Sequence, residues 1–180
     1  PVAWRGPMLH RAIEQFLCDV FWGDLDFLLI DMPPGTGDVA ITVGQQLPNA
    51  EVLVVTTGQT AASEVAVRAG VVARQTGQRI LGVVENMGPL VLPDGSALAL
   101  FGEGGAETVA NELSIGQDKA VQVLAKIPLS LGLREGGDEG TPIVLSNPAD
   151  LAAQAITELA RVIAHSGPSR AGINLGISPA

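Results

Sequence analysis

Short, continuous apolar runs alternate along the chain with stretches whose apolar residues recur every three or four positions. The runs are typical of strands buried on both faces, and they occupy residues 25–31, 51–57, 79–86 and 121–128. The periodic stretches predict amphipathic helices at residues 7–21, 61–76 and 148–166. This order predicts an α/β fold, a layered parallel sheet with helices on both faces, whose ligands lie at the carboxyl ends of the strands.

Local signals add detail to this pattern. Asn147 is the predicted N-cap of the last helix. An Asp-Gly pair at positions 94–95 between apolar flanks predicts a short, protruding hairpin, and the glycine-rich residues 134–140 predict a mobile loop. Residues 1–166 then form a single domain, and residues 167–180, which lack a periodic apolar face, form a flexible tail.

Composition narrows the classes of function. With 180 residues, 47% of them hydrophobic, the chain can bury one substantial core. Its net charge of −9 disfavours a general attraction to nucleic acid or to an anionic membrane surface. Cys18 is the only cysteine, so no intrachain disulfide can form, which favours a reducing, cytoplasmic setting. No apolar stretch approaches the roughly 20 residues that span a bilayer.

The stretch LLIDMPPGTGD at residues 28–38 ends an apolar run with a carboxylate and continues into a loop rich in glycine and proline. Asp31 at the end of a strand can hold Mg²⁺ or its water, and the following glycines let the backbone approach a phosphate. The alternative is a tight strand-to-helix turn in which Asp38 caps the next helix. Turn chemistry alone favours neither interpretation.

The residues around this stretch resemble the Mrp/ApbC family of P-loop ATPases, relatives of MinD and of the nitrogenase iron protein. The resemblance covers nearly all of residues 1–164 and rests on ordered motifs: WRGPMLHRAI, WGDLDFLLIDMPPGTGD, NAEVLVVTTGQTAASEVAVRAG, GVVENM, FGEGG, KIPL and LREGGDEGTPIV. It implies a P-loop NTPase fold of the deviant Walker A type and a homodimer with ATP at its interface. It also implies ATP-driven transfer of iron–sulfur clusters to apoprotein clients.

The resemblance also implies roles for particular residues. Asp31 resembles the Walker B aspartate near Mg²⁺, and Gly35 resembles the switch glycine that senses the γ-phosphate. Asn86 resembles the asparagine that reads the adenine edge, although an asparagine at a strand end is otherwise commonly a turn residue. Pro128 and its neighbours resemble the segment that lines the base. Candidate contacts to phosphate or to the partner subunit are Thr36, Asp38 and Arg134.

The chain departs from the family pattern at two places. No Gly-x-x-x-x-Gly-Lys-Ser/Thr sequence or family variant of it occurs, so we expect a C-terminal portion of a P-loop domain that lacks its first βα unit and does not hydrolyse ATP by itself. The family's Cys-x-x-Cys pair is also missing, and Leu92 and Gly95 lie in the region where its thiolates are expected. Iron–sulfur clusters need thiolate ligands, and Cys18 in the first helix is predicted to be a core residue, so no cluster ligand is identified.

Two alternatives to a cluster-carrying ATPase stay open. One is a nucleotide-dependent binding or scaffold module that carries no cluster, which agrees with the missing cysteine pair. The other is membrane-associated positioning as in MinD, which needs a basic amphipathic C-terminal helix that residues 167–180 do not supply. His10 and His165, both on predicted helices, are interpreted as surface or helix-end residues rather than catalytic ones.

Overall fold

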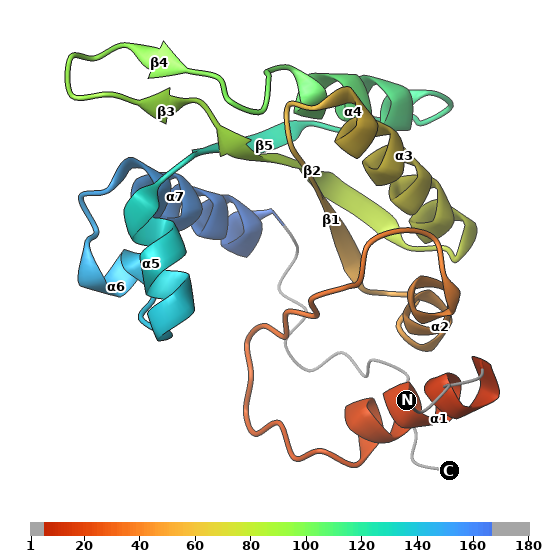
Figure 1. Cartoon of the computed structure of the whole chain (residues 1–180). Coiled ribbons are helices and arrows are strands. Elements are labelled where there is room, and N and C mark those ends of the chain that lie inside the picture. Colours follow the sequence, from red (N-terminus) through yellow and green to blue (C-terminus); the bar gives the residue numbers. More distant parts are fainter. Residues whose placement is uncertain (1–5, 167–180) are drawn as a thin grey trace. The chain divides into compact units, whose positions relative to one another are not determined.

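The structure is a computed structural model that describes residues 6–166 (Figure 1). The tail predicted at residues 167–180 lies outside the described residues. Within the described part, residues 6–52 and 68–80 form one compact unit, and residues 53–67 and 81–166 form a second. The helices are α1 Gly6–Cys18, α2 Asp38–Gln46, α3 Thr60–Gln75, α4 Gly105–Ser114, α5 Leu131–Glu139, α6 Ile143–Ser146 and α7 Leu151–His165. The strands are β1 Glu51–Thr56, β2 Arg79–Gly88, β3 Leu90–Val91, β4 Ala97–Leu98 and β5 Val123–Pro128.

Three of the four predicted strands form a sheet in the order β1-β2-β5, in which β2 and β5 run parallel. The predicted hairpin is confirmed: β3 and β4 pair as antiparallel strands around the Asp-Gly turn. Asp94 accepts hydrogen bonds from the amide and the hydroxyl of Ser96, which lower the pKa of its carboxyl. Gly95 has φ +83°, a conformation that suits glycine in such a turn.

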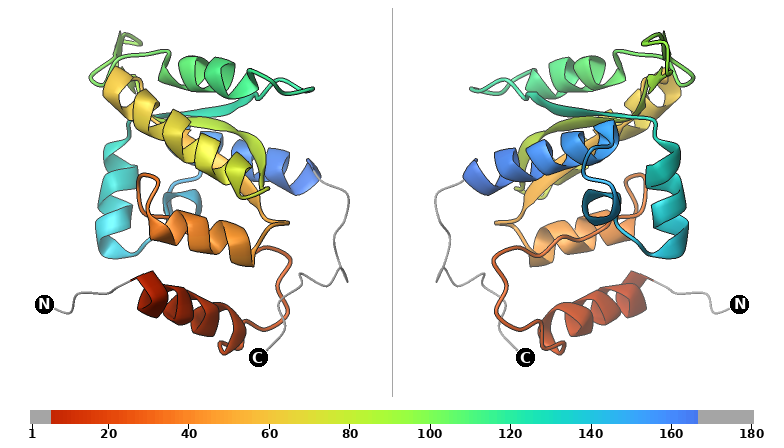
Figure 2. Two further views of the ribbon diagram at one scale, coloured as in Figure 1. Left: turned by 90° about the vertical axis from the view of Figure 1, so that its right-hand side faces the viewer. Right: turned by 90° about the vertical axis from the view of Figure 1, so that its left-hand side faces the viewer.

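Neighbouring residues of β2 show how the second unit covers both faces of its sheet. Val84 packs with Ile127 of β5 and with Ala152 and Leu159 of α7 in one apolar cluster. The next side chain, Glu85, bonds instead to the first turn of α4. Because successive side chains of a strand point to opposite faces, α7 covers one face and α4 the other, as the two views of Figure 2 also show.

The first unit has a small core between α1 and α2. Leu17, Val43 and Leu47 are its buried members, and Cys18 packs against them. This placement agrees with the interpretation of Cys18 as a core residue. Nε2 of His10 in α1 lies 3.1 Å from the carboxamide nitrogen of Gln46 in α2.

The strand predicted at residues 25–31 does not form. These residues have no regular secondary structure, and their apolar side chains are exposed, Leu29 by 86%. The prediction is wrong for a physical reason: a strand needs neighbours that satisfy its backbone N–H and C=O groups, and no described strand pairs with this segment. Apolar composition alone cannot replace those partners.

Three smaller predictions also need correction. Residues 131–139 form helix α5 rather than a mobile loop, because Ser130 caps its start and Gly140 ends it in the left-handed conformation. The N-cap of α7 is Asp150, whose carboxylate accepts hydrogen bonds from two amides of the first turn, whereas Asn147 follows the short helix α6. Asp38 is the first residue of α2 and not its cap, which is Gly37.

Candidate functional site

The pairing of β2 with β5 is irregular near the carboxyl ends of the two strands. Glu85 pairs with Lys126 and Gly88 pairs with Pro128, so β2 contains one residue more than β5 over this interval. Such a bulge redirects side chains and is common beside functional sites. Asn86 and Met87 occupy the bulge, so Asn86 lies at the same end of the sheet as Pro128.

Met87 is the only described non-glycine residue with a positive φ, at 55°. The side-chain oxygen of Asn86 accepts a hydrogen bond of 2.9 Å from the Met87 amide, which compensates part of the cost of this conformation. After the bulge, the Leu129 amide donates to the Gly88 carbonyl at 2.9 Å. The segment that carries Asn86 therefore holds a specific, strained shape between two paired positions.

A pocket of about 250 Å³ opens beside Pro128, in the second unit. Its walls are Leu90 and Val91 of the hairpin, residues 128–132 and residues 150–152. At its polar side the Ser130 hydroxyl donates to the Asp150 carboxylate at 2.9 Å, while each residue caps its own helix. Asn86 does not line this pocket.

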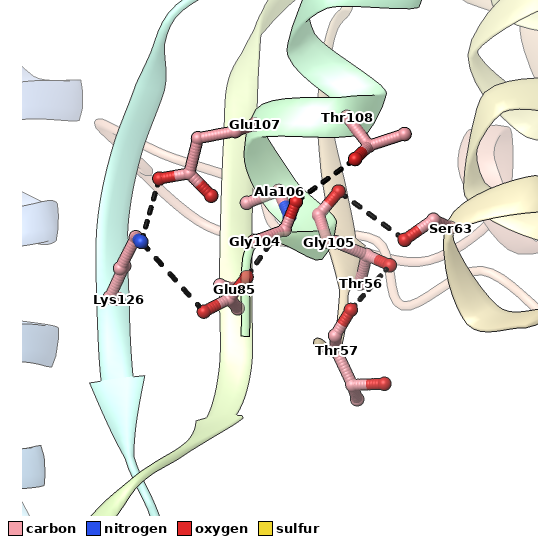
Figure 3. Close-up of polar contacts among 10 residues, drawn as sticks. All are labelled: Thr56, Thr57, Ser63, Glu85, Gly104, Gly105, Ala106, Glu107, Thr108 and Lys126. Carbon is pink, nitrogen blue, oxygen red and sulfur yellow. Dashed lines mark hydrogen bonds and ion pairs between the residues drawn. The ribbon is translucent and has the colours of Figure 1, made fainter. Parts of the chain in front are cut away.

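Glu85, the residue before the bulge, is a buried carboxylate between β2 and α4 (Figure 3), and it was not among the site residues predicted from the sequence. One of its oxygens accepts a hydrogen bond of 3.0 Å from the Ala106 amide in the first turn of α4. The other lies 4.0 Å from Nζ of Lys126, which also binds Glu107 at 2.6 Å. The hydrogen bond between Lys126 and Glu107 lowers the pKa of Glu107 and raises that of Lys126.

The remaining predicted residues belong to the first unit, apart from Arg134. Asp31 is exposed in the irregular segment before α2, Thr36 lies in the same segment just before the N-cap Gly37, and Asp38 is the first residue of the helix. Gly35 has φ +93°, where a side chain would be strained, so the backbone there requires glycine. Arg134 binds Asp138 at 2.9 Å and Glu135 at 3.3 Å on the surface of α5.

The described residues offer little to an iron–sulfur cluster. The hairpin stands where the cysteine pair was expected, and Cys18 packs in the core of the first unit. Among residues 6–166, no three histidine, cysteine or acidic side chains gather in a way that could hold a metal ion. The same residues contain no helix with the length and apolar content needed to cross a membrane.

Comparison with known proteins places these features in context. A family model described as "ParA: NUBPL iron-transfer P-loop NTPase" matches residues 1–164. The "Iron-sulfur cluster carrier protein" of Mycobacterium tuberculosis is 55% identical over 179 residues, which cover 99% of this chain and 47% of that protein. The chain therefore spans about half the length of the curated relatives it matches.

Solved structures show the same fold. The MinD protein of Pyrococcus horikoshii, complexed with Mg-ADP, superposes with a TM-score of 0.61 at 26% identity, covering 96% of this chain and 63% of that one. A nucleotide-binding protein from Archaeoglobus fulgidus in complex with ADP gives a TM-score of 0.59 at 30% identity, covering 92% and 58%. The predicted α/β fold with a parallel sheet is thus confirmed.

Proposed function

Because the chain belongs to the NUBPL iron-transfer family of P-loop NTPases, we propose that it forms the base-binding and switch portion of an ATP-dependent iron–sulfur cluster carrier. The observation that supports this most is the bulge at the end of β2, which presents Asn86 at the edge of the sheet beside Pro128. A carboxamide both donates and accepts hydrogen bonds, which matches the paired acceptor and donor on an adenine edge. The Asn86 oxygen retains a second lone pair after accepting from Met87.

The switch residues complete the proposal. Asp31 would hold Mg²⁺ through its water, and the Gly35 amide would contact the γ-phosphate, with Thr36 and Asp38 near the same phosphate. When bound, Mg²⁺ would neutralise part of the phosphate charge. Arg134 is a second candidate for phosphate or partner contact, but it would have to leave the carboxylates of Glu135 and Asp138 first.

The iron–sulfur cluster would be cargo, and we identify no residue of this chain that would bind it. These 180 residues contribute one cysteine, and thus two to a homodimer, fewer than the four ligands of common clusters. We therefore keep a second candidate function, a nucleotide-dependent binding or scaffold module, which the cysteine-free hairpin favours. In both cases the active form is a cytoplasmic homodimer, and in the first its clients are apoproteins.

The affinity of the 180-residue chain for adenosine and for cytidine tests the base site. We expect a preference for adenosine that Asn86→Ala lowers by about tenfold, the size of a lost bidentate base contact. Asn111→Ala, at an exposed position of α4, is the matched control and should change nothing. Equal affinities for both nucleosides would contradict the proposal.

The chain by itself should not turn over MgATP, because it contains no Gly-Lys phosphate-binding loop. Cluster uptake by the full gene product then separates the two candidate functions. A carrier would take up iron and sulfide in stoichiometric amounts, whereas a scaffold module would bind nucleotide and remain free of both. Robust magnesium-dependent hydrolysis by the 180-residue chain would show that the phosphate site has been misassigned.

A further inference from the structure

We propose that Glu85 is a positioning residue for the base site, because its buried carboxylate fastens the bulge that carries Asn86 to the start of α4. The inference rests on the proposed function and deepens it. The same bond joins the two ends of the segment between residues 85 and 106, which contains the β3–β4 hairpin. Glu85 would thus connect both the base site and the hairpin to one anchor, the first turn of α4.

The burial of Glu85 requires an explanation. Only 1% of its surface is exposed, although a carboxylate in such an environment costs free energy unless hydrogen bonds and charges compensate. The Ala106 amide compensates from the first turn of α4, where unpaired N–H groups and the helix dipole favour negative charge. Lys126 adds a positive charge at 4.0 Å.

The start of α4 is itself held firmly, so it can serve as an anchor. The hydroxyl of Ser63 in α3 donates to the Gly105 carbonyl at 3.3 Å (Figure 3). A Cβ on Gly105 would overlap the Thr57 carbonyl oxygen, so the turn is packed against the residues that follow β1. Gly104, the N-cap, has φ +83°. The anchor is therefore fixed by Ser63 of α3 and by the residues that follow β1.

The bulge lies between two fixed positions. Glu85 holds it on the amino side through α4, and the Gly88 carbonyl holds it on the carboxyl side through the Leu129 amide. Between them, Asn86 and the left-handed Met87 have no paired residue in the register of β2 with β5. Their conformation should depend on both ends, and loss of the Glu85 bond should release the amino side.

Two substitutions of similar size separate this role from simple core packing. Glu85→Gln retains a carbonyl oxygen that can accept from the Ala106 amide, whereas Glu85→Met retains the volume and removes the acceptor. Glu107→Gln is the control, because it breaks the ion pair with Lys126 and leaves the Glu85–Ala106 bond in place. Each variant is prepared in the full 180-residue chain.

The first measurement is amide hydrogen exchange followed by mass spectrometry. Glu85→Met should speed exchange about tenfold or more in the first turn of α4 and in residues 86–98, while α7 stays as protected as in the unmodified chain. Glu85→Gln and Glu107→Gln should leave these segments close to unmodified values. Equal exchange in the Met and Gln variants would overturn the proposal.

The second measurement is the ratio of adenosine to cytidine affinity, which packing alone would not change. Glu85→Met should bring the ratio to about one, and Glu85→Gln should restore most of it. A Met variant with an undiminished ratio would overturn the positioning role. If the unmodified chain shows no adenosine preference, the proposed function fails, and the exchange comparison alone decides whether Glu85 fixes the bulge.

Discussion

Two apolar stretches of the molecule have similar composition and opposite environments. In β2, Val83 and Val84 are 0% and 1% exposed, between hydrogen-bonded neighbours on both sides. In residues 25–31, Phe27, Leu28 and Leu29 are all exposed, and none of the described strands pairs with them. Of these two segments, only the one whose backbone has hydrogen-bonded partners is buried, since an unpaired N–H or C=O group opposes burial.

The largest expected effect compares one substitution in the two environments. Leu113→Ala, in the fully buried face of α4, should destabilise the chain by about 2–5 kcal/mol through lost packing and a residual cavity. Leu29→Ala should change stability by less than about 0.5 kcal/mol, because its side chain is already in water. Urea unfolding of both variants measures the difference. Similar losses would mean that residues 25–31 pack against something in solution.

An intermediate effect is expected at two adjacent glycines of α5. A Cβ on Gly136 would overlap the Thr141 carbonyl oxygen, so Gly136→Ala should cost about 1–3 kcal/mol. Gly137 faces open space, and Gly137→Ala should stabilise the helix by about 0.5–1 kcal/mol. Thermal unfolding of the two variants tests whether the contact with the Thr141 carbonyl makes the difference between loss and gain of stability. Two stabilised variants would indicate that α5 does not hold this helical turn.

The smallest effect concerns the half-exposed pair of Glu107 and Lys126. The pKa of Glu107 is lowered by its hydrogen bond with Lys126, so its contribution is present above the unfolded value near 4.5 and is lost as pH falls through the folded value. The raised pKa of Lys126 makes the contribution disappear again as pH rises above 10.5.

Glu107→Gln should therefore lower stability at neutral pH by less than about 1 kcal/mol, as for other exposed ion pairs. The gap between the variant and the unmodified chain should close at acidic pH. Glu112→Gln, on the same helix, is the control for removing one charge. A gap that persists below the folded pKa of Glu107 would contradict the assignment of the ion pair.

The sequence predicted the elements whose partners are also in the described chain. The strands β1, β2 and β5, the helix α3 and the hairpin were all visible in periodicity and turn chemistry. Residues 25–31 carried the same apolar signal. Such a signal shows that a segment is apolar enough to be buried, but it does not show that a strand is available to pair with it. Helix α5 was missed because its glycines favour a loop. Its N-cap, Ser130, is held by a hydrogen bond to Asp150, which is distant in the sequence.

The candidate site was predicted only in part. Resemblance to the family predicted roles for Asn86 and Pro128 at a nucleotide base, which stay predictions, and both residues lie near the carboxyl ends of their strands. The bulge, the left-handed Met87 and the role of Glu85 had no local signal, because each depends on register with β5 or on contact with α4. A glutamate within a continuous apolar strand was the one hint, since a charge there needs a buried partner.

The base site at the ends of β2 and β5 is tested most directly by amide chemical shifts of the 180-residue chain during titration with adenosine. We expect the largest changes at Asn86, Met87, Gly88 and the residues that follow Pro128, with little change in α1 or at the far end of α7. Changes that avoid the ends of β2 and β5, or no saturable change at all, would contradict the assignment of this edge of the sheet as the nucleotide-base site.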